Sequence, residues 1–167
     1  MNMKTKITKG FFSAVLMLFT ASVFAEDAPV RLTNTAMKQV ISINDKGDRE
    51  VSFVEPKTVI PGDVILYTIE FENISDHAIS NIVLNDPVPN NSIYRDGSAK
   101  GENTQVLFSV DGEYFAEADK LFVTENGRQR PATAKDYRVI RWVVKTPLQP
   151  GEKRQVSFKT RIKKPGE

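Results

Sequence analysis

The chain has 167 residues, of which 23 are lysine or arginine and 21 are aspartate or glutamate, with one histidine and no cysteine. A chain without cysteine forms no disulfide bond, so its fold must rest on a hydrophobic core. The even charge balance provides no clustered basic surface, and we therefore expect neither nucleic acid nor an anionic membrane as a partner.

Residues 1–25 have the pattern of a secretory signal peptide. Three lysines within the first nine residues precede a mostly apolar run over 11–24, too short to span a bilayer comfortably, and Val23 and Ala25 supply small residues before a cleavage site. Cleavage would leave Glu26 first, with 20 basic and 21 acidic residues and no cysteine to accept a lipid. We therefore expect an exported protein, periplasmic or extracellular, without an integral membrane segment after cleavage.

The remainder is expected to form a polar leader over residues 26–35 and a single domain over 36–167. Met37–Ile43 is apolar enough for a strand, residues 44–48 combine asparagine, aspartate and glycine as tight turns do, and Val51–Val54 is the expected hairpin partner.

A proline-glycine-aspartate turn at residues 61–63 then begins the central strand, Val64–Glu72, which Asn73 ends. Its apolar and polar side chains alternate with a period of two, which indicates a strand with one buried face. The side chains expected on the buried face are Ile65, Tyr67, Ile69 and Phe71.

Four more strands follow from the same pattern. We expect them at 79–84, 106–110 and 138–145 and after the turn at 150–152, with a short one at 121–123. The prolines at 87 and 89 are expected to end sheet pairing, because proline has no amide hydrogen to donate. Asp111-Gly112 predicts a two-residue hairpin turn, and residues 125–131 a mobile polar loop.

These elements predict an all-β fold, an antiparallel two-sheet sandwich of seven or eight strands without a substantial helix. The residues expected in its core are Ile65, Tyr67, Ile69, Phe71, Ile82, Leu84, Phe108, Ile140, Trp142, Val156, Phe158 and Ile162.

Twelve positions between residues 58 and 162 resemble the bacterial conserved repeat domain, also called domain of unknown function eleven. They are Pro61, Gly62, Asp63, Tyr67, Asn73, Asp86, Pro89, Trp142, Leu148, Pro150, Gly151 and Glu152. The resemblance implies an immunoglobulin-like sandwich of the bacterial envelope or surface with no established enzymatic activity.

Packing does not explain the long excursion from Arg95 to Asp136, and such excursions are where recognition surfaces usually lie. The candidate interaction residues there are Tyr114, Phe115, Arg128 and Arg130. As an alternative, one or both aromatic residues cap the core beside Phe108.

No catalytic, cofactor or metal site is predicted. His77 is the only histidine and is expected to lie in a solvated loop beside Asp76, without the partners that acid-base chemistry needs. Asp63 and Asp86 are interpreted as turn residues, and Glu70 and Glu72 as solvent-facing.

Asn44, Asp45 and Asp48 could offer oxygen ligands to calcium, but the turn lacks the bidentate glutamate of a full loop motif. A plain turn is the alternative interpretation.

Two function classes remain. The first is a non-catalytic structural or protein-interaction module of the bacterial envelope, with other envelope or surface proteins as partners. The second is a soluble periplasmic binding protein for a peptide or glycan. An enzyme is not expected.

Overall fold

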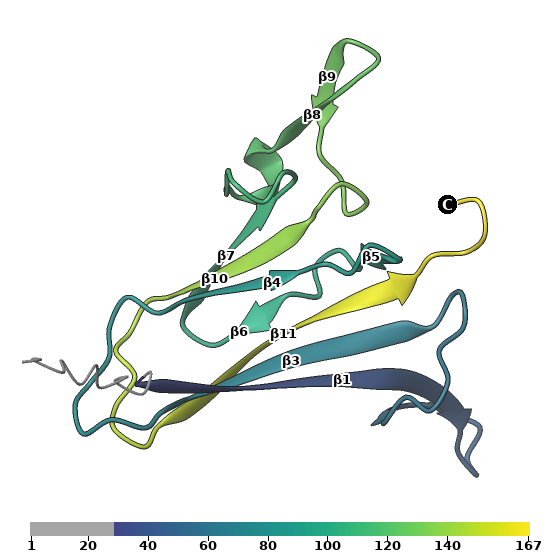
Figure 1. Ribbon diagram of the computed structural model, residues 1–167. Coiled ribbons are helices and arrows are strands. Elements are labelled where there is room, and N and C mark those ends of the chain that lie inside the picture. Colours follow the sequence, from purple (N-terminus) through teal and green to yellow (C-terminus); the bar gives the residue numbers. More distant parts are fainter. Residues whose placement is uncertain (1–28) are drawn as a thin grey trace, which may run out of the picture.

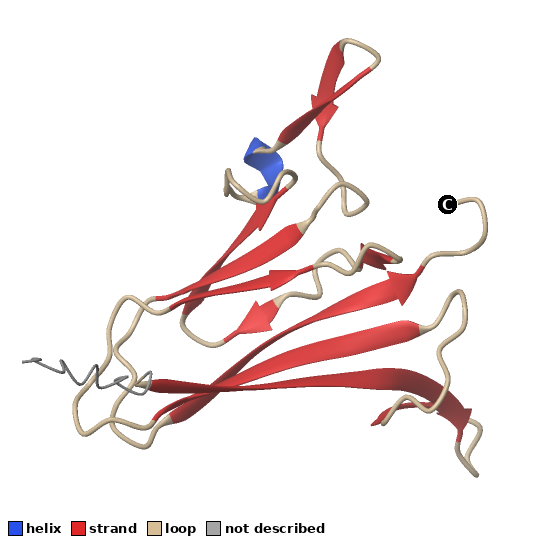
Figure 2. Cartoon of the chain, viewed as in Figure 1, coloured by secondary structure: helices blue, strands red, loops and turns tan. Residues whose placement is uncertain are grey.

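A computed structural model describes residues 29–167, so the expected signal peptide and residues 26–28 lie outside the described part. This part is all-β, with antiparallel sheets that do not close into a barrel, and its one helical element is the 3-10 turn η1, Ala118–Lys120 (Figures 1 and 2). The eleven strands are β1 (Val30–Ile43), β2 (Arg49–Val54), β3 (Val64–Asn73), β4 (Val83–Pro87), β5 (Ser92–Tyr94), β6 (Lys100–Gly101), β7 (Thr104–Ser109), β8 (Phe122–Glu125), β9 (Arg128–Pro131), β10 (Val139–Val144) and β11 (Lys153–Ile162).

The larger sheet has the strand order β2-β1-β3-β11-β5, and β6 also pairs with β11. The predicted hairpin of β1 and β2 and the strand β3 are confirmed. β1, however, begins at Val30, and its first residues pair with β3 from Val30 opposite Asn73 onward. The loose leader expected up to residue 35 is therefore wrong from residue 30. Leu32 is 55% exposed there, so backbone pairing holds this half of β1 more than burial does.

The smaller sheet has the order β4-β10-β7. β4 begins later than expected, and it continues through Pro87, which lies opposite Val139. The amide of Val88 donates to the Arg138 carbonyl over 2.8 Å, so the neighbouring nitrogen of Pro87 points away from β10. β4 is an edge strand, and proline is tolerated at that position because it interrupts no ladder bond.

The two sheets pack against each other through one hydrophobic core. Trp142 on β10 and Phe158 on β11 are 0% and 1% exposed, and their rings lie 6.0 Å apart across the interface. Ten of the twelve predicted core residues are buried, whereas Tyr67 and Ile162 are half-buried. Further buried members come from segments without a clear strand period: Val88, Ile93, Tyr94, Leu121, Tyr137 and Leu148.

Asn73 joins β3 to the loops at one end of the sheets, and it is 0% exposed. Its Nδ2 donates to the carbonyls of His77 and Leu148 over 2.7 and 2.9 Å. Its Oδ1 accepts from the amide and the hydroxyl of Ser75 over 2.9 and 2.7 Å. The amide side chain thus replaces water for the two loops that meet where β3 ends.

The sequence suggested that Asp86 is a turn residue, and this prediction is wrong. Asp86 lies on β4 opposite Ile140, on the face that also carries the buried Leu84, so its half-buried carboxylate points toward the larger sheet. Within residues 29–167 it makes no side-chain hydrogen bond or ion pair. Burial therefore raises the pKa of Asp86 above 3.8.

We expect Asp86→Asn to stabilise the protein at pH 7. Because the folded-state pKa of Asp86 is raised, the unfolded chain binds fewer protons than the folded chain, and the carboxylate lowers stability as pH rises above about 3.8. The urea midpoint of the variant should exceed that of the parent at pH 7, and the difference should shrink toward pH 3. The exposed Asp119→Asn is the control. An unchanged or lower midpoint at pH 7 would contradict this assignment.

Candidate functional site

The hairpin of β8 and β9 extends away from both sheets (Figure 1), and its strands pair only with each other. Asn126 and Gly127 join them with φ of 51° and 74°, the two positive values of a type I′ turn. This segment was expected to be a mobile loop. The asparagine-glycine pair is typical of a hairpin turn. The strands beside it are polar, however, and lack the apolar alternation by which a strand is recognised in a sequence.

Arg130 fixes this hairpin to the chain that follows it. Its Nη1 and Nη2 donate to the two carboxylate oxygens of Asp136 over 2.7 and 3.0 Å, and its Nε donates to Glu125 over 2.7 Å. The guanidinium holds the pKa of Asp136 well below its usual range. Such two-point pairing is geometrically specific. Arg130 therefore acts as a brace of the hairpin, and its charge is already paired.

Tyr114 and Phe115 lie in the loop after β7, and neither joins the core cluster, whereas the next residue, Ala116, does. Tyr114 is 63% exposed. Phe115 is half-buried beneath Arg141, whose Cζ lies 3.4 Å from the ring centroid, a cation–π contact. Tyr114 is thus the one of this pair that is free to contact a partner.

The chain reversal before Tyr114 is wider than the predicted two-residue turn. Phe108 pairs with Ala116, and Asp111 Oδ1 accepts from the amides of Glu113 and Tyr114 over 2.8 and 3.0 Å. These bonds lower the pKa of Asp111. The aspartate side chain therefore shapes a longer loop instead of a tight hairpin.

The four predicted interaction residues are distributed over two places. Arg128 is exposed and lines an open hollow on the hairpin together with Arg130, Glu125, Asn126 and Gln129. Tyr114 and Phe115 do not line this hollow. Phe122 at the start of β8 is 52% exposed, and sequence reasoning missed it because it treated residues 121–123 as a short scaffold strand.

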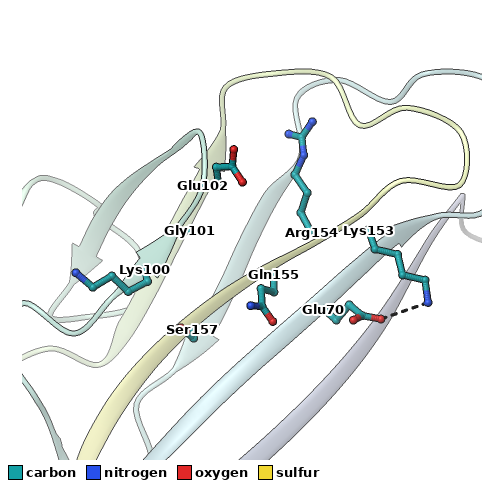
Figure 3. Close-up of a pocket in the computed structure, with 8 residues that line it drawn as sticks. All are labelled: Glu70, Lys100, Gly101, Glu102, Lys153, Arg154, Gln155 and Ser157. Carbon is teal, nitrogen blue, oxygen red and sulfur yellow. Dashed lines mark ion pairs between the residues drawn. The ribbon is translucent and has the colours of Figure 1, made fainter.

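A second surface is a polar trough on the outer face of the larger sheet (Figure 3). Figure 3 shows the ion pair of Lys153 with Glu70, with Nζ and Oε1 3.6 Å apart. The residues that line the trough are Glu70, Lys100, Gly101, Glu102, Lys153, Arg154, Gln155 and Ser157. Lys100 and Ser157 also line an adjoining hollow that reaches Gln39 and Val51.

One wall of the trough is formed by residues 100–102, and residues 95–98 before them line the adjoining hollow. This wall exists because β5 and β6 pair with β11, at Tyr94 opposite Thr160 and at Gly101 opposite Val156. The two-residue strand β6 has no readable period, which is why the sequence did not reveal the trough. Glu70 lies at the rim of the trough, half-buried, where the sequence placed it in solvent.

The remaining candidates are architectural. Asn44 Oδ1 accepts from the amides of Lys46 and Asp48 over 3.0 and 2.9 Å, as expected of a turn. Asp63 accepts from the Ile60 amide over 2.8 Å and pairs with Lys38 over 2.7 Å, and these bonds, that of Lys38 first, lower its pKa.

His77 and Asp76 form an exposed pair, with Nδ1 and Oδ1 3.0 Å apart. Within residues 29–167, no three histidine, aspartate or glutamate side chains gather into a potential metal site. In the same part of the chain, no helix is long and apolar enough to cross a membrane.

Comparison with protein families, curated proteins and solved structures finds no match to this chain.

Proposed function

We propose that the protein is an exported, non-catalytic interaction module of the bacterial envelope with an immunoglobulin-like arrangement of its two sheets. The observation that supports this most is the braced β8–β9 hairpin. It extends from the sheets, presents Phe122 and Arg128 to solvent, and is held by the pairing of Arg130 with Asp136. A hairpin ordered before binding loses little conformational entropy when a partner docks.

The signal-peptide pattern of residues 1–25 supports export, and the twelve positions shared with the conserved repeat domain support the envelope and the immunoglobulin-like arrangement. Two antiparallel sheets around a central tryptophan, Trp142, agree with that family's expected architecture. The proposed partner is another envelope or surface protein that contacts the hairpin.

A photo-crosslinking experiment tests this proposal. A photoreactive residue at position 122 should crosslink to another envelope protein in living cells, and the crosslinked product should begin at Glu26. Arg128→Ala should weaken the crosslink because it removes an exposed cation from the hairpin. The same probe at exposed position 90, on the loop after β4, is the control. Retention of Met1 in the cytoplasm, or equal crosslinking from both positions, would contradict the proposal.

The polar trough favours a second candidate function, the binding of a peptide or glycan. Its mixed acidic, basic and amide side chains could pair with hydroxyl or peptide groups. A ligand that binds there should raise the thermal unfolding midpoint of the parent chain. Lys100→Ala and Gln155→Ala should remove that shift, whereas Arg128→Ala should leave it unchanged.

A further inference from the structure

β2 is an edge strand with a free outer side. The order of the larger sheet places β2 at its border, and no strand within residues 29–167 pairs with the outer side of β2. Natural edge strands are usually protected by proline, bulges or inward-pointing charges. Residues 49–54 contain no proline, and their pairing with β1 runs without a bulge from Arg49 to Val54. Glu50 is the one charged side chain of β2 on the core-facing side.

The face of this hairpin that points away from the core is apolar and exposed. Ile41 and Val51 lie opposite each other and are 48% and 52% exposed, and Ile43 on the same face is 64% exposed. Phe53 shares this face, and Lys159 Nζ lies 5.1 Å from its ring centroid. The apolar stripe therefore borders the free edge.

The free backbone groups of β2 follow from its register. The Asn44 amide donates to the Asp48 carbonyl over 2.9 Å, so these two residues form a hydrogen-bonded pair. Because such pairs alternate in an antiparallel ladder, every second pair of this hairpin up to Val54 is also hydrogen-bonded. The amides and carbonyls of Val51 and Phe53 consequently point outward. They are free to pair with another strand.

We propose that β2 pairs with β2 of a second copy of this chain, antiparallel, with Ser52 of both copies on the two-fold axis. In this register Val51 lies opposite Phe53 of the other copy, and Arg49 lies opposite its Glu55. The outward backbone groups of Val51 and Phe53 then bond to each other. On the face that points away from the core each side chain meets a complementary one, whereas on the opposite face Glu50 meets Val54. Because the same strand of each copy forms the contact about a two-fold axis, the contact is self-complementary.

The neighbouring registers lack this match. An axis at Val51 places Arg49 opposite Phe53, and an axis at Phe53 places Val51 opposite Glu55. On the face that points away from the core, each of these leaves a charge opposite an apolar side chain, which the axis at Ser52 does not. Charge complementarity on that face therefore favours the axis at Ser52. This inference is independent of the proposed hairpin function, because it uses the opposite end of the molecule (Figure 1).

A cysteine at the axis tests the register, since the chain has no cysteine of its own. Ser52 would form a non-hydrogen-bonded pair with Cα atoms about 4.5 Å apart, within the range of a disulfide. Ser52→Cys should therefore give a covalent dimer under mild oxidation. Glu50→Cys is the matched control, because two such residues would lie roughly 13 Å apart along the ladder. Equal crosslinking of both variants would overturn the register.

A charge reversal tests the pairing in solution. At low salt, Arg49→Glu or Glu55→Arg alone should raise the dimer dissociation constant about tenfold in sedimentation experiments, and the double variant should restore it. Arg138→Glu, at the exposed residue just before β10, controls for net charge. A parent chain that stays monomeric at about 1 mM, or single reversals without effect, would overturn the proposal.

Discussion

Replacing Trp142 with alanine should lower the free energy of unfolding by about 3 to 5 kcal/mol. Trp142 is 0% exposed in the middle of β10, and its ring packs toward Phe158 between the two sheets. The sheets cannot close over a vacancy of that size without moving their strands. Chemical denaturation followed by circular dichroism measures the loss.

Two further variants make this test specific. Tyr114→Ala removes an exposed aromatic ring and should change stability by about 0.5 kcal/mol or less. Trp142→Phe should cost less than alanine, since it keeps much of the ring and removes a buried Nε1 that has no partner among the described residues. Stability that survives Trp142→Ala would mean that the tryptophan does not support the core.

Asn73→Ala should lower the free energy of unfolding by about 2 to 4 kcal/mol. The substitution leaves the buried carbonyl of Leu148 with the Ile79 amide as its one remaining donor, and it removes the acceptor of the Ser75 amide. Hydrogen exchange should also quicken locally, at the paired amides of Ile79 and Leu148, because Asn73 holds both loops.

The exposed Asn90→Ala is the control for this effect, with an expected change within about 0.5 kcal/mol. If Asn73→Ala unfolds at the same denaturant concentration as the parent, water replaces the amide fully and Asn73 is not a structural link.

The strands with strong alternation were predictable. β3, β10 and β11 each place apolar side chains at every second position toward one core, and this period identified Ile69, Trp142 and Phe158 as buried. Thr160, by contrast, is 0% exposed at the next inward position of β11, where a hydroxyl gave no sign of burial. Pattern reasoning therefore found the strands better than it found each buried residue.

The missed features depend on contacts between distant segments. Leu148 is 0% exposed because it pairs with Ile79 across the end of the smaller sheet, a contact 69 positions apart in the chain. Gly101 must be small because a Cβ there would lie 2.9 Å from Val156 and 3.1 Å from Trp142. Neither constraint is visible in the local period of the sequence.

The candidate surfaces were predictable only in part. Arg128 and Tyr114 are exposed, as a partner contact requires, but Arg130 is occupied by Asp136 and Glu125. The positions of the two acids were visible in the sequence, yet pairing with them requires the chain to turn back at residues 132–136. The sequence alone did not predict that the chain turns back there.

The arrangement of β1, β3 and β11 has a mechanical consequence. β1 and β11 lie on either side of β3 and are both antiparallel to it, so they run in the same direction, and the start of β1 and the end of β11 are at opposite ends of the sheet (Figure 1). Tension between those two points loads both ladders in shear, so their hydrogen bonds must break together instead of one after another. The rate of forced unfolding follows the unfolding barrier, and this geometry raises that barrier along the direction of pull.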